Sequence, residues 1–135
     1  MKTYFADTSY LLALELSNDQ NHESALAHWK NLTKTSFAVV TTSYVFDETT
    51  TYLNSRNHHA KAVEVGENLL LSPTIELVHI DENLFFEGWT MFQKHHDKRY
   101  SLTDCISFVV MKQKELEIAL TFDKHFVQAE LKIEP

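Results

Sequence analysis

The stretch Thr103–Lys114, TDCISFVVMKQK, decides the fold class of this chain because its apolar side chains point to nearly every side of a helix. The apolar members are Cys105, Ile106, Phe108, Val109, Val110 and Met111. A helix that is apolar all round is buried inside a protein, whereas a surface helix has one polar face. We therefore expect other elements of the chain to cover this helix.

The rest of the chain alternates short apolar runs with longer segments of helical periodicity. The runs predicted as strands are residues 3–6, 37–41, 75–79, 118–121 and 131–133. Strands that alternate with helices indicate a parallel sheet covered by helices on both faces. The sequence therefore predicts an α/β sandwich.

Three of the helical segments carry an apolar stripe, which normally faces the core. The stripes are Ala25, Leu26, Trp29 and Leu32; Val45, Tyr52 and Leu53; and Phe85, Trp89 and Phe92. Asp81 precedes the third stripe and is suited to cap the start of its helix.

Length and composition describe one globular domain, residues 1–135, with 44% hydrophobic residues. The net charge of −7 argues against a protein that coats nucleic acid without specificity, because such binding needs a basic surface. The single Cys105 excludes an intrachain disulfide and fits a reducing compartment. No stretch has the length of a membrane span, and the N-terminus lacks the pattern of a signal peptide. We expect a cytoplasmic protein that does not associate with membranes.

Four acidic residues lie in apolar sequence where a predicted element begins or ends: Asp7, Glu48, Asp104 and Asp123. Asp7 and Asp123 follow predicted strands, and ligands of parallel α/β sheets bind beyond the carboxyl ends of the strands. Asp104 opens the buried helix, and Glu48 shares a stripe with Val45, so we expect Glu48 to point inward. These four acids can meet in one pocket.

Carboxylates gathered in one pocket need a compensating cation, because burying unpaired charge is costly. Hard divalent ions such as Mg²⁺ and Mn²⁺ take oxygen ligands, whereas Zn²⁺ favours Cys and His in spacings that are absent here. Such an ion can activate water and stabilise an in-line phosphodiester displacement. One alternative stays open at this point, since Asp7 or Asp123 could simply cap the helix that follows it.

Four passages of the chain resemble PIN-domain ribonucleases of the VapC toxin class. They are residues 5–9 (FADTS), 42–49 (TSYVFDET), 100–105 (YSLTDC) and 120–126 (LTFDKHF). The resemblance implies a three-layer α/β/α sandwich with a central parallel sheet, and a site that uses Mg²⁺ or Mn²⁺ to cut single-stranded RNA. It also implies a small antitoxin protein as partner and a homodimer.

The resemblance assigns the metal and catalytic roles to Asp7, Glu48, Asp104 and Asp123. The hydroxyl residues around these acids would be Thr8, Ser9, Ser101, Thr103 and Thr121. Asp47 points about 100° away from Glu48 on a helix, so we choose Glu48 as the ligand. We hypothesise that metal-bound water attacks the phosphodiester and leaves a 5′-phosphate. The chain departs from many relatives by carrying Glu130 in place of a glycine.

The one basic cluster, Lys94–Tyr100, leads toward Asp104. Lys98 and Arg99 could contact RNA phosphates, or the cluster could be a solvated helix end whose cations complement the helix dipole. His125 could act as a general acid, although a histidine between Phe122 and Phe126 is more often structural.

Three other functions are alternatives to the nuclease. A haloacid-dehalogenase-like phosphatase needs a second Asp where this chain has Ser9, and a receiver domain needs paired acids beside Asp7. The stronger rival is a catalytically silent PIN fold that only binds RNA or a protein.

Overall fold

The computed structural model describes residues 1–135 and contains one five-stranded sheet with the order β3-β2-β1-β4-β5. All neighbouring strands run parallel. The strands are β1 Lys2–Ala6, β2 Phe37–Thr42, β3 Ile75–Val78, β4 Ile118–Leu120 and β5 Lys132–Glu134. Each of the five predicted strands is confirmed, with ends displaced by at most one residue.

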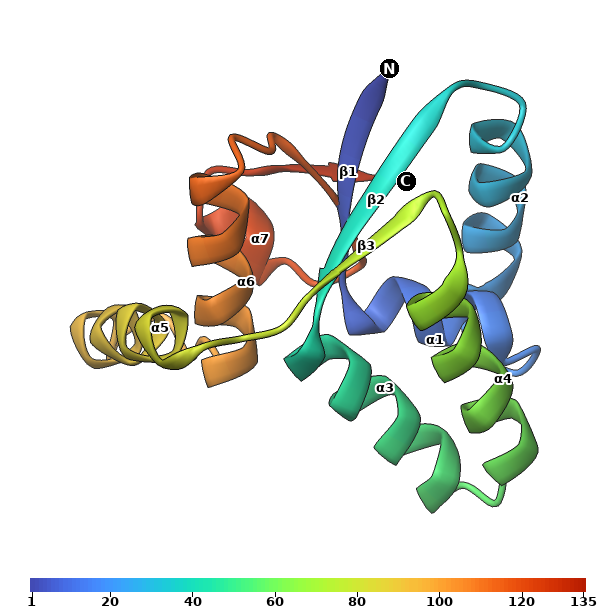
Figure 1. Ribbon diagram of the computed structural model, residues 1–135, viewed down its shortest axis with the longest axis horizontal. Helices are drawn as coiled ribbons and strands as arrows, with labels where there is room; N and C mark the ends of the chain where they lie inside the picture. The colour runs from blue at the N-terminus through green and yellow to red at the C-terminus, as the bar shows by residue number, and fades with distance from the viewer.

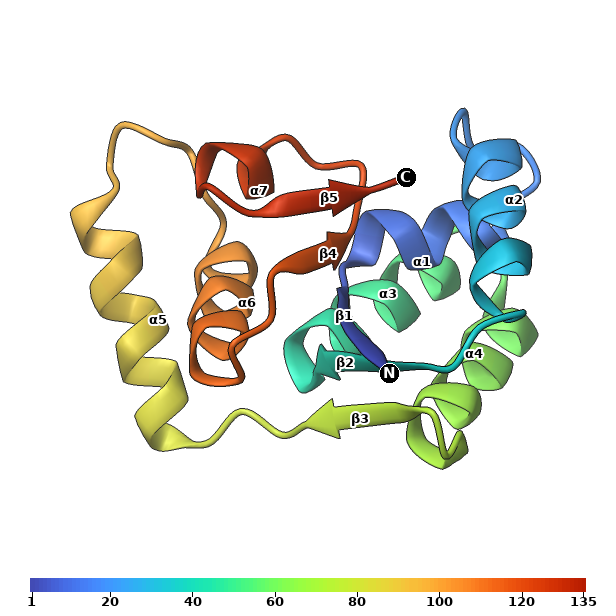
Figure 2. The same cartoon turned by 90° about the horizontal axis from the view of Figure 1, so that it is seen from above.

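Seven helices cover the sheet from both sides, which confirms the three-layer α/β/α sandwich (Figures 1 and 2). The helices on one side are α1 Thr8–Glu15, α2 His22–Leu32, α3 Ser43–Ser55 and α4 His59–Leu71. Those on the other side are α5 Glu82–Lys94, α6 Leu102–Gln113 and α7 His125–Gln128. Helix α5 lies outside α6, as the outermost element of its side (Figure 2). None of the helices combines the length and apolar character needed to cross a bilayer.

Alternating side chains of β1 enter two different cores, as the period of two in a strand requires. Phe5 belongs to the cluster that contains Phe108 of α6. Its neighbour Tyr4 belongs to the cluster that contains Tyr10 of α1. The central strand β1 therefore packs against helices on both faces of the sheet, which explains why residues 4–6 are continuously apolar.

The buried helix predicted from residues 103–114 is α6, and every residue from Asp104 to Met111 is buried. Its N-terminal end, with Asp104, opens at the same edge of the sheet as the carboxyl end of β1. The buried helix α6 therefore places Asp104 at the edge of the sheet where ligands bind.

The prediction that the aromatic stripe of α5 faces the core is wrong. Trp89 and Phe92 are 41% and 38% exposed and stack on each other with ring centroids 5.5 Å apart. The residues of α5 that are buried are Leu84 and Gly88. A Cβ on Gly88 would lie 2.4 Å from Ile106 Cγ1, so the missing side chain allows α5 to approach α6 closely. This close contact turns the larger aromatic side chains outward.

Candidate functional site

The carboxyl ends of β1 and β4 open into a pocket of about 360 Å³ that all four predicted acids line. Asp7 directly follows β1, and Asp123 comes three residues after β4 ends. Asp104 enters from the first turn of α6, and Glu48 from α3. The tertiary fold thus brings together four carboxylates that lie far apart in sequence.

Asp7 is the most buried of these acids, with 4% of its surface exposed. Its Oδ2 accepts hydrogen bonds from Ser9 Oγ at 3.0 Å and from Thr121 Oγ1 at 2.8 Å. Its side chain makes no capping hydrogen bond to α1, so the alternative of a simple helix cap is not realised here. Burial raises the pKa of Asp7 to about 6; the hydrogen bond from Thr121 opposes this rise, and the charge of Asp104 adds to it.

Asp104 both caps α6 and faces the pocket. Its backbone N–H donates to Ser101 Oγ at 3.0 Å, and its Oδ2 accepts from the Ser101 N–H at 3.0 Å, which completes a capping box. The same Oδ2 accepts from His125 Nδ1 at 2.9 Å. The capping role therefore occupies one carboxylate oxygen and leaves Oδ1 for the pocket.

Glu48 lines the pocket with the other acids, but the expectation that it lies on the buried stripe of α3 is wrong. The residue is exposed, while the buried face of α3 consists of Val45, Thr49 and Leu53. Tyr52, predicted on the buried stripe, is also exposed, at 38%. Glu48 Oε1 accepts a hydrogen bond of 2.6 Å from Thr8 Oγ1, which holds the flexible side chain against α1.

Asp123 is positioned by the short connection between β4 and α7. Its backbone N–H donates to Thr121 Oγ1 at 2.9 Å, and its Oδ1 accepts from the His125 N–H at 2.9 Å. Thr121 therefore links two acids, because its hydroxyl also donates to Asp7. Asp47, the acid next to Glu48, accepts only a local bond from Thr51 and does not line the pocket.

All four carboxylates share one arrangement, in which the protein donates to one oxygen and leaves the other without a protein donor. Such a set of open carboxylate oxygens fits a hard divalent cation, which prefers oxygen ligands and keeps several waters. Ligand atoms of Asp104, Asp123 and His125 also lie within 4.8 Å of one another. The acids could therefore hold a metal ion, and the fixed oxygens would orient them toward it.

The predicted hydroxyl residues divide into four that contact an acid and one that does not. Thr8, Ser9, Ser101 and Thr121 make the contacts given above. The hydroxyl of Thr103 makes no hydrogen bond, and only its carbonyl accepts one, from Ser107 Oγ at 2.9 Å. The structure does not bring the Thr103 side chain to an acid.

The two predicted RNA-contact residues line different hollows of the structure. Arg99 lines the acidic pocket and makes no ion pair with an acid, whereas Lys98 lines a different hollow, near Leu131. Arg99 lies in the turn before α6 and has a backbone φ of 59°, in the left-handed region. Sequence reasoning missed the contact of His125 with Asp104, although its position two residues after Asp123 was a usable signal.

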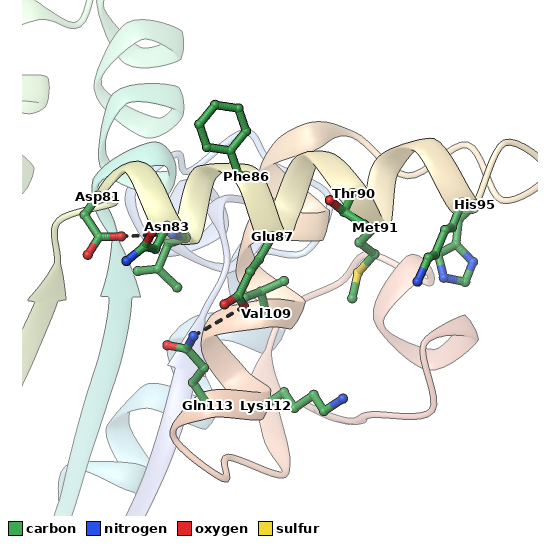
Figure 3. A pocket seen from close by; sticks show the side chains of 12 residues that line it. Asp81, Asn83, Phe86, Glu87, Thr90, Met91, His95, Val109, Lys112 and Gln113 are labelled. Carbon is green, nitrogen blue, oxygen red and sulfur yellow. Dashed lines mark hydrogen bonds between the residues drawn. The ribbon is translucent and has the colours of Figure 1, made fainter.

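A larger hollow lies elsewhere, between α5 and α6, with a volume of about 1130 Å³. Figure 3 shows its two helical walls and the single link across them, in which Gln113 Nε2 donates to Glu87 Oε2 at 3.3 Å. Its lining mixes acids with the cations Lys94 and Lys112 and includes none of the four predicted ligands. Convergent ligand chemistry, which this hollow lacks, identifies the smaller pocket as the candidate site.

Comparison with known proteins agrees with the fold and with the resemblance in the sequence. The chain is 33% identical over 125 residues to the 23S rRNA-specific endonuclease VapC20 of Mycobacterium tuberculosis, a match that covers 93% of this chain and 92% of the relative. The crystal structure of that protein, described as a sarcin–ricin loop cleaving toxin, superposes with a TM-score of 0.88 at 31% identity, over 98% and 99% of the two chains.

Two more distant structures share the fold. FitAcB from Neisseria gonorrhoeae has a TM-score of 0.69 at 18% identity and covers 98% of this chain and 96% of its own. VapBC2 from Rickettsia felis, bound to a DNA fragment from its promoter, has a TM-score of 0.69 at 14% identity, with coverage of 98% and 97%. A sequence profile described as PIN domain matches residues 4–131, nearly the whole chain. The chain belongs to the PIN domain family.

Proposed function

We propose that this chain is an endoribonuclease that hydrolyses phosphodiester bonds of RNA and acts as the toxin of a toxin–antitoxin pair. The observation that carries the proposal is the convergence of four carboxylates on one pocket, each with an oxygen open to a ligand. Membership of the PIN domain family and the likeness to a ribosomal RNA endonuclease over 93% of the chain support it.

A divalent cation is the counter-charge that fits this pocket, and we propose Mg²⁺, with Mn²⁺ able to replace it. Asp7 and Asp104 would hold the main ion, while Glu48 and Asp123 would complete the site or orient water. When bound, such an ion lowers the pKa of water and neutralises charge on the phosphate.

The residues of the chain supply orientation and phosphate binding. The hydrogen bonds from Thr121 and Ser101 fix Asp7 and Asp104, so these acids need no reorganisation when a substrate arrives. Arg99 at the pocket can pair with a phosphate of the RNA backbone. We propose that water attacks the phosphorus and that the bond to the 3′-oxygen breaks, which leaves a 5′-phosphate on one product.

The proposed substrate is structured RNA, the sarcin–ricin loop of 23S rRNA. The relative that is described as cleaving this loop is 31% identical in its crystal structure and matches nearly all of this chain. A nuclease with a net charge of −7 has little nonspecific attraction to RNA, which suits a target chosen by shape.

We further propose that residues 1–135 form one domain that assembles as a homodimer and is neutralised by a small antitoxin protein. Because the proposed substrate is ribosomal RNA, the protein would act in the cytoplasm. Size-exclusion chromatography with light scattering tests the dimer. Co-purification with the product of the adjacent gene tests the antitoxin.

The central experiment incubates the purified protein with ribosomes in Mg²⁺, in Mn²⁺ and in EDTA, and maps cuts in 23S rRNA by primer extension. The Asp104→Asn variant serves as the matched inactive protein. We expect a single cut that needs metal and is absent in the variant. Full cleavage by folded Asp104→Asn would refute the assignment, and RNA binding without cleavage in any metal would favour the silent binding module.

A further inference from the structure

The imidazole of His125 lies between two acids that come from different elements. Its Nδ1 is 2.9 Å from Asp104 Oδ2 and 3.4 Å from Asp123 Oδ1. The ring packs edge-on against Tyr100, with centroids 5.5 Å apart and an interplanar angle of 79°. Because only 28% of the side chain is exposed, this packing holds the ring in one orientation.

The chemistry of the two neighbours determines which ring nitrogen carries the hydrogen. Both are carboxylate oxygens, which only accept hydrogen bonds when ionised. A bare Nδ1 would place its lone pair against theirs, so the contact requires a hydrogen on Nδ1. In the neutral ring, Nε2 is then without a hydrogen.

This hydrogen bond fixes the carboxylate of Asp104 from a second direction. The Ser101 N–H donates to the same Oδ2 from within the cap of α6, and His125 donates from α7. Two donors from separate elements leave the carboxylate little freedom to rotate, and they direct Oδ1 into the pocket. The residue therefore couples the short helix α7 to the start of the buried helix α6.

We propose that His125 is a positioning residue, whose Nδ1–H holds Asp104 in the orientation that binds the divalent ion. The inference rests on the proposed metal site and adds to it a residue that the four-carboxylate description leaves out. Removing the hydrogen-bond partner of a metal ligand typically weakens metal affinity 10–100-fold. A residue that served only to pack would not produce this loss once the fold is intact.

The test measures Mn²⁺ affinity by isothermal titration calorimetry, without RNA, for wild type and for His125→Asn, His125→Gln and His125→Ala. The amide nitrogen of Asn can occupy the position of Nδ1, whereas that of Gln lies near the position of Nε2. His95→Asn is the matched control, because His95 also packs against Tyr100, at 5.6 Å, but contacts no acid. Circular dichroism and thermal melting establish that each variant is folded.

We expect His125→Asn and His95→Asn to bind Mn²⁺ within about threefold of wild type, and His125→Gln and His125→Ala to bind 10–100-fold more weakly. Wild-type affinity in folded His125→Ala would overturn the inference, as would rescue by Gln in place of Asn. Cleavage lost at unchanged Mn²⁺ affinity would also overturn it, because His125 would then act on the RNA. Failure of the wild type itself to bind Mn²⁺ would instead refute the proposed metal site.

A measurement on the wild type keeps the inference testable if the Ala and Gln variants do not fold. Long-range ¹H–¹⁵N NMR of the histidine rings reports which ring nitrogens carry a hydrogen. Comparison with the folded Asn variant assigns the His125 signals. The inference requires a hydrogen on Nδ1 of His125, and a ring that carries its only hydrogen on Nε2 would contradict it.

Discussion

The acidic pocket and the hollow between α5 and α6 are two concave regions of this molecule that differ in size and in chemistry. The hollow is about three times larger, at about 1130 Å³ against about 360 Å³. Inside the pocket, each acid is held by donors on other elements or on the adjacent turn. Across the hollow, the single side-chain hydrogen bond joins exposed Glu87 and Gln113. The comparison shows that fixed, convergent ligands mark a site better than volume does.

The largest expected effect separates the two regions directly. Asp7→Asn and Asp104→Asn should each lower the rate of RNA cleavage by at least about 10²–10³-fold, because each removes a charge that the reaction needs. The equivalent change in the hollow, Glu87→Gln, should leave the rate within about twofold of wild type. Single-turnover cleavage rates of folded variants check both. Equal losses in the pocket and the hollow would remove the distinction between them.

A second test concerns the stability of the metal-free protein. The pKa of Asp7 is raised to about 6 by burial, above the ordinary value of about 3.9. Between these pH values the carboxyl group of Asp7 is protonated in the folded protein and ionised in the unfolded chain. The free energy of unfolding therefore falls as pH rises from about 4 to about 6. The loss approaches about 3 kcal/mol at neutral pH.

Asp7→Asn should remove this contribution. Urea unfolding in EDTA across that pH range measures the free energy of unfolding of wild type and variant. The difference between the two proteins isolates Asp7 from the other titrating groups. A difference that does not change with pH would show that Asp7 titrates normally.

A third test treats the α5–α6 contact as structural. Gly88→Ala should destabilise the fold by about 1–3 kcal/mol, because the new Cβ would lie 2.4 Å from Ile106 Cγ1 and 3.3 Å from Ile106 Cα. Gly66→Ala is the control, since its Cβ would meet side-chain atoms alone, the edge of the Phe46 ring at 3.1 Å and Thr50 Cγ2 at 3.7 Å. Denaturant midpoints report both changes. A neutral Gly88→Ala would show that α5 can move away from α6 without cost.

A fourth test distinguishes the two cations that the sequence had paired. Arg99→Ala should weaken RNA binding and reduce the salt dependence by about one phosphate contact, whereas Lys98→Ala should change neither. The structure supports this difference by placing only Arg99 in the acidic pocket. Binding of the inactive Asp104→Asn protein to RNA at several salt concentrations provides the measurement. If both variants bind RNA with the same affinity and salt dependence, the basic cluster Lys94–Tyr100 is better described as a solvated helix end.

The smallest expected effect lies in the turn that leads to β5. Glu130 has a φ of 66°, in the left-handed region that glycine adopts freely and other residues adopt at a cost. Glu130→Gly should therefore raise the free energy of unfolding by about 1 kcal/mol. Thermal melting measures this gain, and cleavage should be unaffected. A destabilised variant would show that the Glu130 side chain contributes contacts that outweigh its backbone strain.

Much of the fold followed from local pattern. The five strands and the buried helix α6 were predictable because an element buried on all sides must be apolar on all sides. The buried face of α5 was not predictable, because it depends on which small residue of α5 contacts α6. Gly88 carries no apolar signal, whereas Trp89 and Phe92 do, so periodicity favours the wrong face.

The acids that form the site were predictable from the sequence, but the contacts that they make were not. Asp7, Asp104 and Asp123 could be placed at one edge because parallel strands and the helices that follow them share it. The exposure of Glu48 could not be predicted. A long side chain at the margin of an apolar stripe can reach the pocket although its own residue is exposed. The contact between His125 and Asp104 depends on the packing of α7 against α6, which no local pattern encodes.

We propose that the four carboxylates of the acidic pocket, and not the residues of the larger hollow, bind the metal ion. Anomalous diffraction from crystals of the protein soaked in Mn²⁺ tests it most directly. We expect a peak in the pocket within ligand distance of Asp7 and Asp104, and no peak there in Asp104→Asn crystals. A protein that binds Mn²⁺ only in the α5–α6 hollow, or shows no peak among the four acids, would contradict it.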